Sequence, residues 1–279
     1  MPRITGGHRT SVGQVEAPRL DVLLSRSDVP DVPRTGDRLA ADPAEGLLTA
    51  LYAWSPAPRR APAVRANMIA SLDGAATGAD GRSGSINGPA DLRVFTVLRA
   101  LADVVLVGAG TVRAEGYGAP RTPAPLLPGR RERGQAEHPA LAVVTASGDV
   151  PQALLGEDPA PWVFTTAQSR HLGRLRDTLP DERLTVHDGS VDLALVVAAL
   201  GAARLPAVLT EGGPRLLGTL LEDDLVDEVC LTTAPRVVGG RAARVVDGIG
   251  WLEPPRPAAL VHLLHGDGML ITRWALRHG

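Results

Sequence analysis

The regular part of the chain begins with a strand pattern. Over residues 64–71 apolar and polar side chains alternate, with one face made of Val64, Ala66, Met68 and Ala70. After Pro89, apolar residues recur three and four positions apart, the spacing of one helical face, at Val94, Val97, Leu98 and Leu101. The apolar run 104–107 follows directly. This order of strand, helix and strand predicts a βαβ unit with parallel pairing and a right-handed crossover.

The alternation of strand and helix patterns continues along the chain. Further strands are expected over residues 141–145, 162–166, 184–187 and 207–210, with helices near 167–178 and 191–202 and from Pro214. Residues 226–234 then form a strand pattern without a following helix. Segments 258–265 and 269–276 flank Gly266-Asp267-Gly268, which is typical of a hairpin. The predicted fold class is therefore α/β, with a mixed, mostly parallel twisted sheet, helices on both faces and an antiparallel C-terminal hairpin.

The first 62 residues differ from the rest. They are rich in Pro, Gly and Arg, and only the apolar segment 47–54 favours a helix, which Ser55-Pro56-Ala57-Pro58 would end. We predict a partly irregular N-terminal arm over residues 1–62, laid over one domain at 63–279. No internal repeat is visible.

Composition excludes several classes of function. The 29 basic side chains are all Arg, so chemistry that needs a catalytic lysine is ruled out. A formal charge of −2 offers no basic field for nucleic acid. No stretch reaches the roughly 18 apolar residues of a membrane span, and no signal-peptide pattern is present. We expect a soluble, cytoplasmic protein with a small-molecule substrate and neither a nucleic-acid nor a membrane partner.

Metal and disulfide chemistry are also disfavoured. The single cysteine, Cys230, lies in an apolar run, where a packed thiol is far more common than a reactive one. The seven histidines, including His262 and His265, lack the spacing of a metal site. We therefore predict no bound metal.

Two glycine-rich segments follow predicted strands, where ligands bind in open α/β sheets. In Gly108-Ala109-Gly110-Thr111-Val112-Arg113 the third glycine of a Rossmann fingerprint is missing, so an ordinary tight turn is an equal alternative. In Glu211-Gly212-Gly213-Pro214 two glycines bring bare backbone to a helix start, which suits a phosphate group. A third strand ends in Val144-Thr145-Ala146-Ser147, whose hydroxyls suit a ribose but are also common in turns.

Taken in order, four segments resemble the reductase domain of bacterial riboflavin biosynthesis and, more distantly, dihydrofolate reductase. They are Ser71-Leu72-Asp73-Gly74, residues 98–112, Glu211-Gly212-Gly213-Pro214, and residues 225–228 continued through Ala234-Pro235 to Gly239-Gly240. The likeness extends over about residues 64–276. It implies a dihydrofolate reductase-like three-layer fold and a homodimer.

The resemblance also implies NADPH as the cofactor, lying across the carboxyl ends of the strands. Its expected contacts are Gly108, Gly110, Thr111, Val144, Thr145, Ser147, Gly212, Gly213 and Leu216. The Gly212-Gly213 peptide bond is expected to be cis, as its counterpart is in dihydrofolate reductases. Thr145, Ser147 and nearby arginines are candidate ligands of the 2′-phosphate.

For the reaction, the resemblance implies hydride transfer to C1′ of a phosphoribosylamino-pyrimidine, which turns a ribosyl into a ribityl side chain. Asp73 and Glu211 are the candidate catalytic residues. Ser71 and Asn87 would contact the substrate. A surface Asp73 that only caps a turn is the alternative.

The segment 113–121 departs from the family pattern, because the usual proline after the acidic residue is missing. Glu115 could replace the acid, and Arg121 or Arg113 the phosphate ligand. The substrate therefore stays open. The first hypothesis is reduction of 5-amino-6-(5-phosphoribosylamino)uracil; the second is a dihydrofolate or pterin reductase; the third is a non-catalytic NADPH sensor. A fused zinc deaminase is not expected, because one cysteine cannot supply its ligands.

Overall fold

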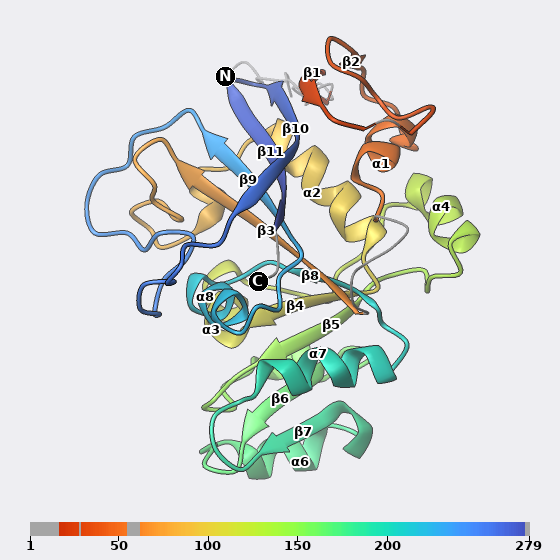
Figure 1. Cartoon of the computed structure of the whole chain (residues 1–279). Coiled ribbons are helices and arrows are strands. Elements are labelled where there is room, and N and C mark those ends of the chain that lie inside the picture. The colour runs from red at the N-terminus through yellow and green to blue at the C-terminus, as the bar shows by residue number, and fades with distance from the viewer. Residues whose placement is uncertain (1–16, 28, 55–61, 277–279) are drawn as a thin grey trace, which may run out of the picture.

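The architecture is one large mixed sheet with helices on both faces (Figure 1). The computed structural model describes residues 17–27, 29–54 and 62–276. The sheet has eleven strands in the order β2-β1-β10-β11-β9-β3-β8-β4-β5-β6-β7. The seven strands from β9 to β7 pair in parallel, and the four at the other end pair antiparallel. The predicted fold class is confirmed.

The strands have the following bounds. They are β1 (Leu20–Ser25), β2 (Arg38–Leu39), β3 (Ala63–Ser71), β4 (Val104–Gly108), β5 (Ala140–Val144), β6 (Trp162–Thr166), β7 (Leu184–His187), β8 (Ala207–Thr210), β9 (Glu228–Ala234), β10 (Ala258–Gly266) and β11 (Met269–Leu276). The strands predicted from period and apolar runs are thus all present. The C-terminal hairpin is confirmed too, and Asp267 and Gly268 both take positive φ in its two-residue turn.

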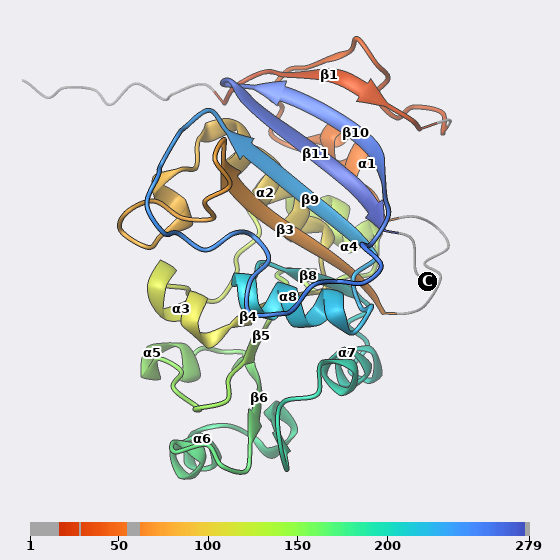
Figure 2. The same ribbon diagram turned by 60° about the vertical axis from the view of Figure 1, so that its left-hand side comes forward.

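The helices connect the parallel strands. They are α1 (Gly46–Tyr52), α2 (Pro89–Leu101), α3 (Ala109–Glu115), α4 (Leu127–Glu132), α5 (Gln152–Leu155), α6 (Leu172–Thr178), α7 (Leu193–Ala202) and α8 (Pro214–Glu222), with short 3-10 turns at 83–85, 124–126 and 181–183. Helices α1, α2, α3, α5 and α6 pack on one face of the sheet, and α7 and α8 on the other (Figure 2). The alternative prediction of an ordinary tight turn at Gly108-Gly110 is wrong, because helix α3 begins at Ala109.

The N-terminal arm extends the sheet. Only helix α1 was expected in it, yet β1 pairs antiparallel with β10, and β2 with β1. Arg93 of α2 fastens this region, since its guanidinium bonds both oxygens of Glu45 at 2.6 Å and the carbonyls of Pro18, Leu39 and Ala40. The proline-rich stop predicted at 55–58 lies outside the described residues. The short strands were missed because their polar and apolar residues do not alternate over enough positions to be distinctive.

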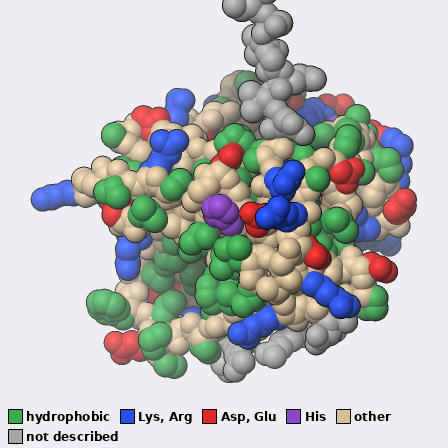
Figure 3. All heavy atoms as spheres, turned by 90° about the horizontal axis from the view of Figure 1, so that it is seen from above, with side chains coloured by type: hydrophobic (Ala, Val, Ile, Leu, Met, Phe, Trp, Pro, Cys, Tyr) green, Lys and Arg blue, Asp and Glu red, His purple; other side chains and the backbone are tan. Residues whose placement is uncertain are grey.

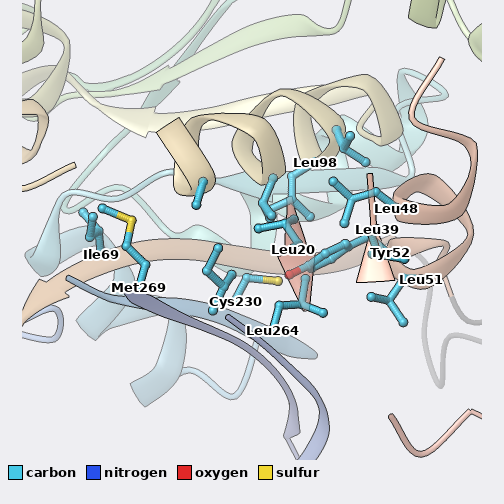
Figure 4. Close-up of a cluster of buried hydrophobic side chains, with 14 of the residues drawn as sticks. Leu20, Leu39, Leu48, Leu51, Tyr52, Ile69, Leu98, Cys230, Leu264 and Met269 are labelled. Carbon is cyan, nitrogen blue, oxygen red and sulfur yellow. The ribbon is translucent and has the colours of Figure 1, made fainter. Parts of the chain in front are cut away.

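A core under the arm joins it to the rest of the chain (Figure 4). Leu20, Leu39 and Leu48 of the arm pack with Leu98 of α2 and with Cys230 of β9. Tyr52 is fully buried and meets the ring of His262 edge to face, with centroids 4.5 Å apart. The burial of several large apolar side chains, each stabilising by about 1.5–3 kcal/mol, makes the arm an integral part of the fold.

The surface carries both signs of charge. On the face seen in Figure 3, acidic and basic side chains are interspersed without a field of one sign. Over the part of the chain that the structure describes, no helix combines the length and apolar character needed to cross a membrane. The mixture of both signs agrees with the small formal charge of −2.

Candidate functional site

Two hollows lie at the carboxyl ends of the parallel strands. The first is a cavity of about 380 Å³, named here the polar cavity, with walls from β3, α2, the end of α3 and Glu211. The second is a groove of about 650 Å³, named here the glycine groove, between the starts of α3 and α8 and the end of β5. Ligands of open α/β sheets bind at this edge, so both hollows are placed for function.

The glycine groove contains nearly all the residues predicted for the cofactor. Its lining includes Gly108, Gly110, Thr111, Val144, Thr145, Ser147, Gly213 and Leu216. Gly212 lies beside it, and its carbonyl accepts a hydrogen bond from the Gly108 amide at 2.9 Å. The arginines Arg113 and Arg215 also line the groove. Segments separated by 100 residues in the sequence therefore meet in one hollow.

Glycine is required where α8 begins. A Cβ on Gly213 would lie 2.7 Å from the Thr111 hydroxyl oxygen, which is too close for a real contact. The Gly212-Gly213 peptide is cis, as expected from the resemblance. Gly213 caps α8 without a side-chain hydrogen bond, and the first turn of this nine-residue helix, Pro214 to Leu216, lines the groove. These features suit an anionic group such as a pyrophosphate.

The segment 211–213 separates the two hollows. The side chain of Glu211 lines the polar cavity, whereas Gly213 and Pro214 line the glycine groove. Its backbone is fixed, because the Glu211 amide donates to the Leu106 carbonyl at 3.1 Å. A ligand in the groove and a ligand in the cavity would thus lie on two sides of one short, well-held segment.

Helix α2 contributes a polar stripe to the cavity. Asp91, Phe95 and Arg99 are four residues apart, so they lie on one side of the helix, and all three line the cavity. Arg99 stacks on Phe95, with the guanidinium carbon 4.2 Å from the ring centre. The sequence pattern predicted only the packing face of α2, and this stripe was not predicted. The signal was present, since Asp91 falls on the apolar face three and seven residues before Val94 and Leu98.

Glu211 is held by three donors. Arg99 Nε and Nη2 each donate to one carboxylate oxygen at 2.7 Å, and Tyr117 Oη donates to Oε2 at 2.5 Å. The side chain is only 2% exposed. Burial lowers the pKa of Arg99, but its hydrogen bonds and attraction to Glu211 outweigh this and raise that pKa above its usual value. Burial and the Glu211 charge raise the pKa of Tyr117 well above its usual value, so Tyr117 stays a donor.

Asp91 is a second buried carboxylate in the cavity, and its surroundings differ. It is 4% exposed, and the hydroxyl of Thr232 and the amide group of Asn87 donate to it. Neither donor is charged. Burial raises the pKa of Asp91, and the two hydrogen bonds offset this only in part.

The predicted substrate residues are divided between the cavity and its surroundings. Asn87 and Glu115 line the cavity, and Glu115 also accepts a hydrogen bond from the Ser83 amide at 2.7 Å. Ser71, Asp73 and Arg121 are not among the lining residues. Arg121 is exposed and lies 3.5 Å from Glu157, while Arg113 lies at the glycine groove and bonds the Asp149 carbonyl.

Asp73 organises a neighbouring loop. Its carboxylate accepts the Ser71 hydroxyl at 2.5 Å and the amides of Val238 and Gly239 at 3.1 and 2.7 Å. These hydrogen bonds, led by that from Ser71, lower the pKa of Asp73 to about 2. An exposed carboxylate with three donors is the geometry of a loop anchor, which is the alternative role that the sequence left open for Asp73.

A mostly parallel sheet, a glycine groove for an anionic cofactor and an adjoining polar cavity define an α/β enzyme that brings a nucleotide beside a small substrate. The family model of the RibD C-terminal domain matches residues 62–267. The chain belongs to this family. That membership makes it a reductase and points to a nicotinamide cofactor.

Known proteins similar to the chain agree with this assignment. The 2,5-diamino-6-ribosylamino-4(3H)-pyrimidinone 5′-phosphate reductase of Archaeoglobus fulgidus is 28% identical, covering 76% of this chain and 97% of that protein. The enzyme of the same name from Methanothermobacter thermautotrophicus is 33% identical, covering 68% and 85%. Among solved structures, a pyrimidine reductase-like protein from Corynebacterium diphtheriae has a TM-score of 0.71 at 25% identity, covering 83% of this chain and 99% of that one.

Proposed function

We propose that the protein reduces a 6-ribosylaminopyrimidine 5′-phosphate with NADPH, a step of riboflavin biosynthesis. The observation that carries the proposal is the position of segment 211–213, whose two sides belong to the polar cavity and the glycine groove. Two substrates fit this class. The archaeal relatives are named for the 2,5-diamino compound, whereas the resemblance seen in the sequence favours 5-amino-6-(5-phosphoribosylamino)uracil.

The residues of the glycine groove fit a dinucleotide. Gly110 leaves open space where a side chain would project, and the first amides of α8 suit the pyrophosphate. Thr145 and Ser147 line the same groove and would contact the adenosine ribose. Arg113 and Arg215 in the same lining would bind a 2′-phosphate and so favour NADPH over NADH.

The reaction requires a hydride and a proton. A reduced nicotinamide, when bound, supplies the hydride to C1′; the C1′–O4′ bond breaks, O4′ takes the proton and the ribosyl group becomes ribityl. The chain positions the substrate for this step. Glu211, Arg99 and Tyr117 form a rigid polar wall of the cavity, and Glu115 fixes the turn at Ser83.

The roles proposed for the predicted residues follow from their positions. We assign Glu211 and Asn87 to the substrate wall, and Gly212 to the support of Gly108 behind the cofactor. Asp73 and Ser71 are positioning residues, because they hold the loop at 238–239. A homodimer, which the family resemblance implies, remains a prediction that sedimentation would test.

Turnover is the direct test. Purified protein with NADPH is offered the diamino compound, the uracil compound and dihydrofolate in separate reactions, and loss of NADPH absorbance is followed. We expect oxidation with at least one of the two pyrimidines. Oxidation with dihydrofolate alone would replace the proposal by a folate-type reductase. NADPH binding without turnover of any compound would support a sensor.

The cofactor groove has its own test, the substitution Gly110→Ala. The added methyl group meets no protein atom but enters the groove, so we expect the Kd for NADPH to rise at least tenfold. Gly173→Ala is the matched control, because Gly173 is also helical and exposed with open space around it, but lies in α6 away from the groove. Alanine should stabilise both helices by up to about 1 kcal/mol. Equal NADPH affinity in the two variants would contradict this assignment.

A further inference from the structure

We infer that the N-terminal arm positions the active site, and that Arg93 is the positioning residue through which the arm holds helix α2 against the polar cavity. The inference rests on the proposed function for the reaction that it affects. The family model matches residues 62–267, so the described part of the arm, residues 17–27 and 29–54, lies outside the matched segment. The arm packs on the one helix that supplies Phe95 and Arg99 to the cavity wall.

Helix α2 has different partners on its two sides. At about 100° per residue, Arg93 lies on the side of the helix roughly opposite Phe95. Phe95 lines the polar cavity, whereas Arg93 and Thr96 line a second hollow, of about 740 Å³, between α2 and the arm. Leu98 of α2 packs against three leucines of the arm, Leu20, Leu39 and Leu48 (Figure 4). The helix therefore lies between the arm and the cavity, and a shift on one side is passed to the other.

Arg93 uses every donor of its guanidinium group to hold the arm. Its Nε and Nη2 each donate to one Glu45 oxygen at 2.6 Å. Its Nη1 donates to the carbonyls of Pro18 and Leu39 at 2.8 and 3.0 Å, and Nη2 also donates to that of Ala40 at 2.8 Å. The five N–H groups of an arginine are thus all engaged, and the side chain is 4% exposed. One side chain joins three separate segments of the arm to a single turn of α2.

The carboxyl end of α2 is also fixed. Trp54 of the arm donates from its indole nitrogen to the Leu101 carbonyl at 2.9 Å. Arg130 of α4 donates from Nη1 to the carbonyls of Ala100 and Ala102 at 3.0 and 2.7 Å. The last carbonyls of a helix have no partner within it, so these donors stabilise its end and fix its position. With Arg93 near one end and Trp54 at the other, the arm leaves α2 little freedom to slide or turn.

The position of α2 matters because of Arg99. It lies six residues after Arg93, roughly 9 Å further along the helix. Its Nε and Nη2 each donate to one oxygen of Glu211 at 2.7 Å, and such a bidentate pair tolerates little displacement. A shift of about 1 Å in a group that positions a substrate can slow a reaction strongly. None of the described residues that line the glycine groove belongs to α2, so the arm should act on the substrate and not on NADPH.

The first test is Arg93→Gln in the full chain. Glutamine offers two donors in place of five, so the arm loses most of its hold on α2. We expect kcat/KM for the pyrimidine to fall about tenfold, with the Kd for NADPH unchanged. Arg131→Gln is the matched control, because Arg131 also pairs with a glutamate, Glu137, but both side chains are about 60% exposed. It should change neither quantity. A Kd for NADPH that rises in parallel with the loss of turnover would indicate general loosening of the fold and overturn the inference.

A double-mutant cycle tests whether Arg93 acts through the cavity wall. If it does, adding Arg93→Gln to Glu211→Gln should change kcat/KM little, because the wall is already disrupted. Effects that multiply would show that Arg93 acts elsewhere and would overturn the inference. Glu45→Gln is a milder entry to the same cycle should Arg93→Gln fold poorly, since it keeps the three bonds from Arg93 to carbonyls. Its effect should have the same direction, be smaller, and likewise vanish beside Glu211→Gln.

Hydrogen exchange followed by mass spectrometry gives a readout that needs no turnover. Residues 115–118 form a wall of the polar cavity, and Tyr117 reaches Glu211 from there. In Arg93→Gln we expect faster exchange in 115–118 as well as in the arm and α2, and unchanged exchange in the groove segment 144–147. Faster exchange confined to the arm and α2 would assign Arg93 a purely stabilising role and overturn the inference. If no pyrimidine is reduced, the proposed function fails, and the exchange pattern still decides whether the arm sets the cavity wall.

Discussion

Two buried glutamates use the same chemistry at two different places in this protein. Glu211 and Glu228 each leave 8% of the whole residue exposed, and each is paired with arginine at 2.6–2.7 Å. Glu211 faces the polar cavity, with Arg99 and Tyr117 as partners. Glu228 on β9 lies in the sheet between Arg65 of β3 and Arg273 of β11. Their surroundings decide what each pair does.

The pair around Glu228 serves the fold. Arg65 and Arg273 bond Glu228 and also donate to the last carbonyls of α1, those of Leu51, Tyr52 and Ala53. One glutamate thus places two cations at the carboxyl end of a helix, where the helix dipole favours them. Burial raises the pKa of Glu228, but the two guanidinium groups outweigh it and hold that pKa below its ordinary value. Both Glu228 oxygens find their partners within the protein, although Arg65 Nη2 has no hydrogen-bond partner among the described residues, whereas the Glu211 cluster has one side open to a ligand.

The largest effect is expected from Glu228→Gln. The change leaves two buried arginines without their counter-charge, which costs about 3–5 kcal/mol of unfolding free energy. The melting temperature should fall by an amount on the order of 10 °C. Because Glu228 has no contact with the cavity or the groove, kcat per folded molecule should stay close to that of the wild type.

Thermal unfolding followed by circular dichroism measures the fall in melting temperature of Glu228→Gln. Turnover at low temperature measures its kcat. Glu182→Gln, at an exposed position in the 3-10 turn at 181–183, is the control and should change neither. A Glu228→Gln protein as stable as the wild type would show that the arginines find other partners. Glu228 would then not be needed for the stability of the fold, and the contrast with Glu211 would not hold.

Glu211→Gln should give the opposite result. The amide keeps one acceptor oxygen, so it cannot hold both Arg99 nitrogens and the Tyr117 hydroxyl. We expect kcat/KM to fall about 100-fold, which corresponds to about 2.7 kcal/mol of lost transition-state stabilisation. The melting temperature should change less than in Glu228→Gln, since Arg99 is partly exposed. Steady-state kinetics and thermal unfolding on the same preparation of each variant test this contrast. A larger loss of stability in Glu211→Gln than in Glu228→Gln would contradict it.

Much of the fold could be predicted because its central part is governed by local patterns. The alternation at 64–71, the helical spacing after Pro89 and the Asp267-Gly268 turn all correspond to observed elements. The arm could not be predicted in the same way. Its strands are short, and they exist because β1 pairs with β10, more than 230 residues away. Long-range pairing leaves little trace in a short segment.

The site was predicted unevenly for a related reason. Glycines in a sequence mark positions where the backbone needs unusual conformational freedom, so the cofactor segments could be identified from them. Most of the predicted cofactor residues line one groove. The polar cavity depends on which side of α2 faces β3, and on the close approach of Tyr117 to Glu211 across 94 positions of sequence. Arg99 lay within a matched motif but was given no role, and Asp91 was not singled out. A charged residue on an apolar helical stripe was the available signal.

The smallest effect, and the finest test of the comparison, is expected from Tyr117→Phe. The substitution removes one of the three donors to Glu211 and keeps the ring that Arg99 approaches at 5.4 Å. A hydrogen bond to a charged group contributes about 1.5–3 kcal/mol, but Arg99 still satisfies both carboxylate oxygens, so we expect the lower end of that range. This predicts roughly a tenfold fall in kcat/KM with little change in NADPH affinity. A loss as large as in Glu211→Gln would mean that the tyrosine hydroxyl contacts the substrate itself, and that the carboxylate serves mainly to aim it.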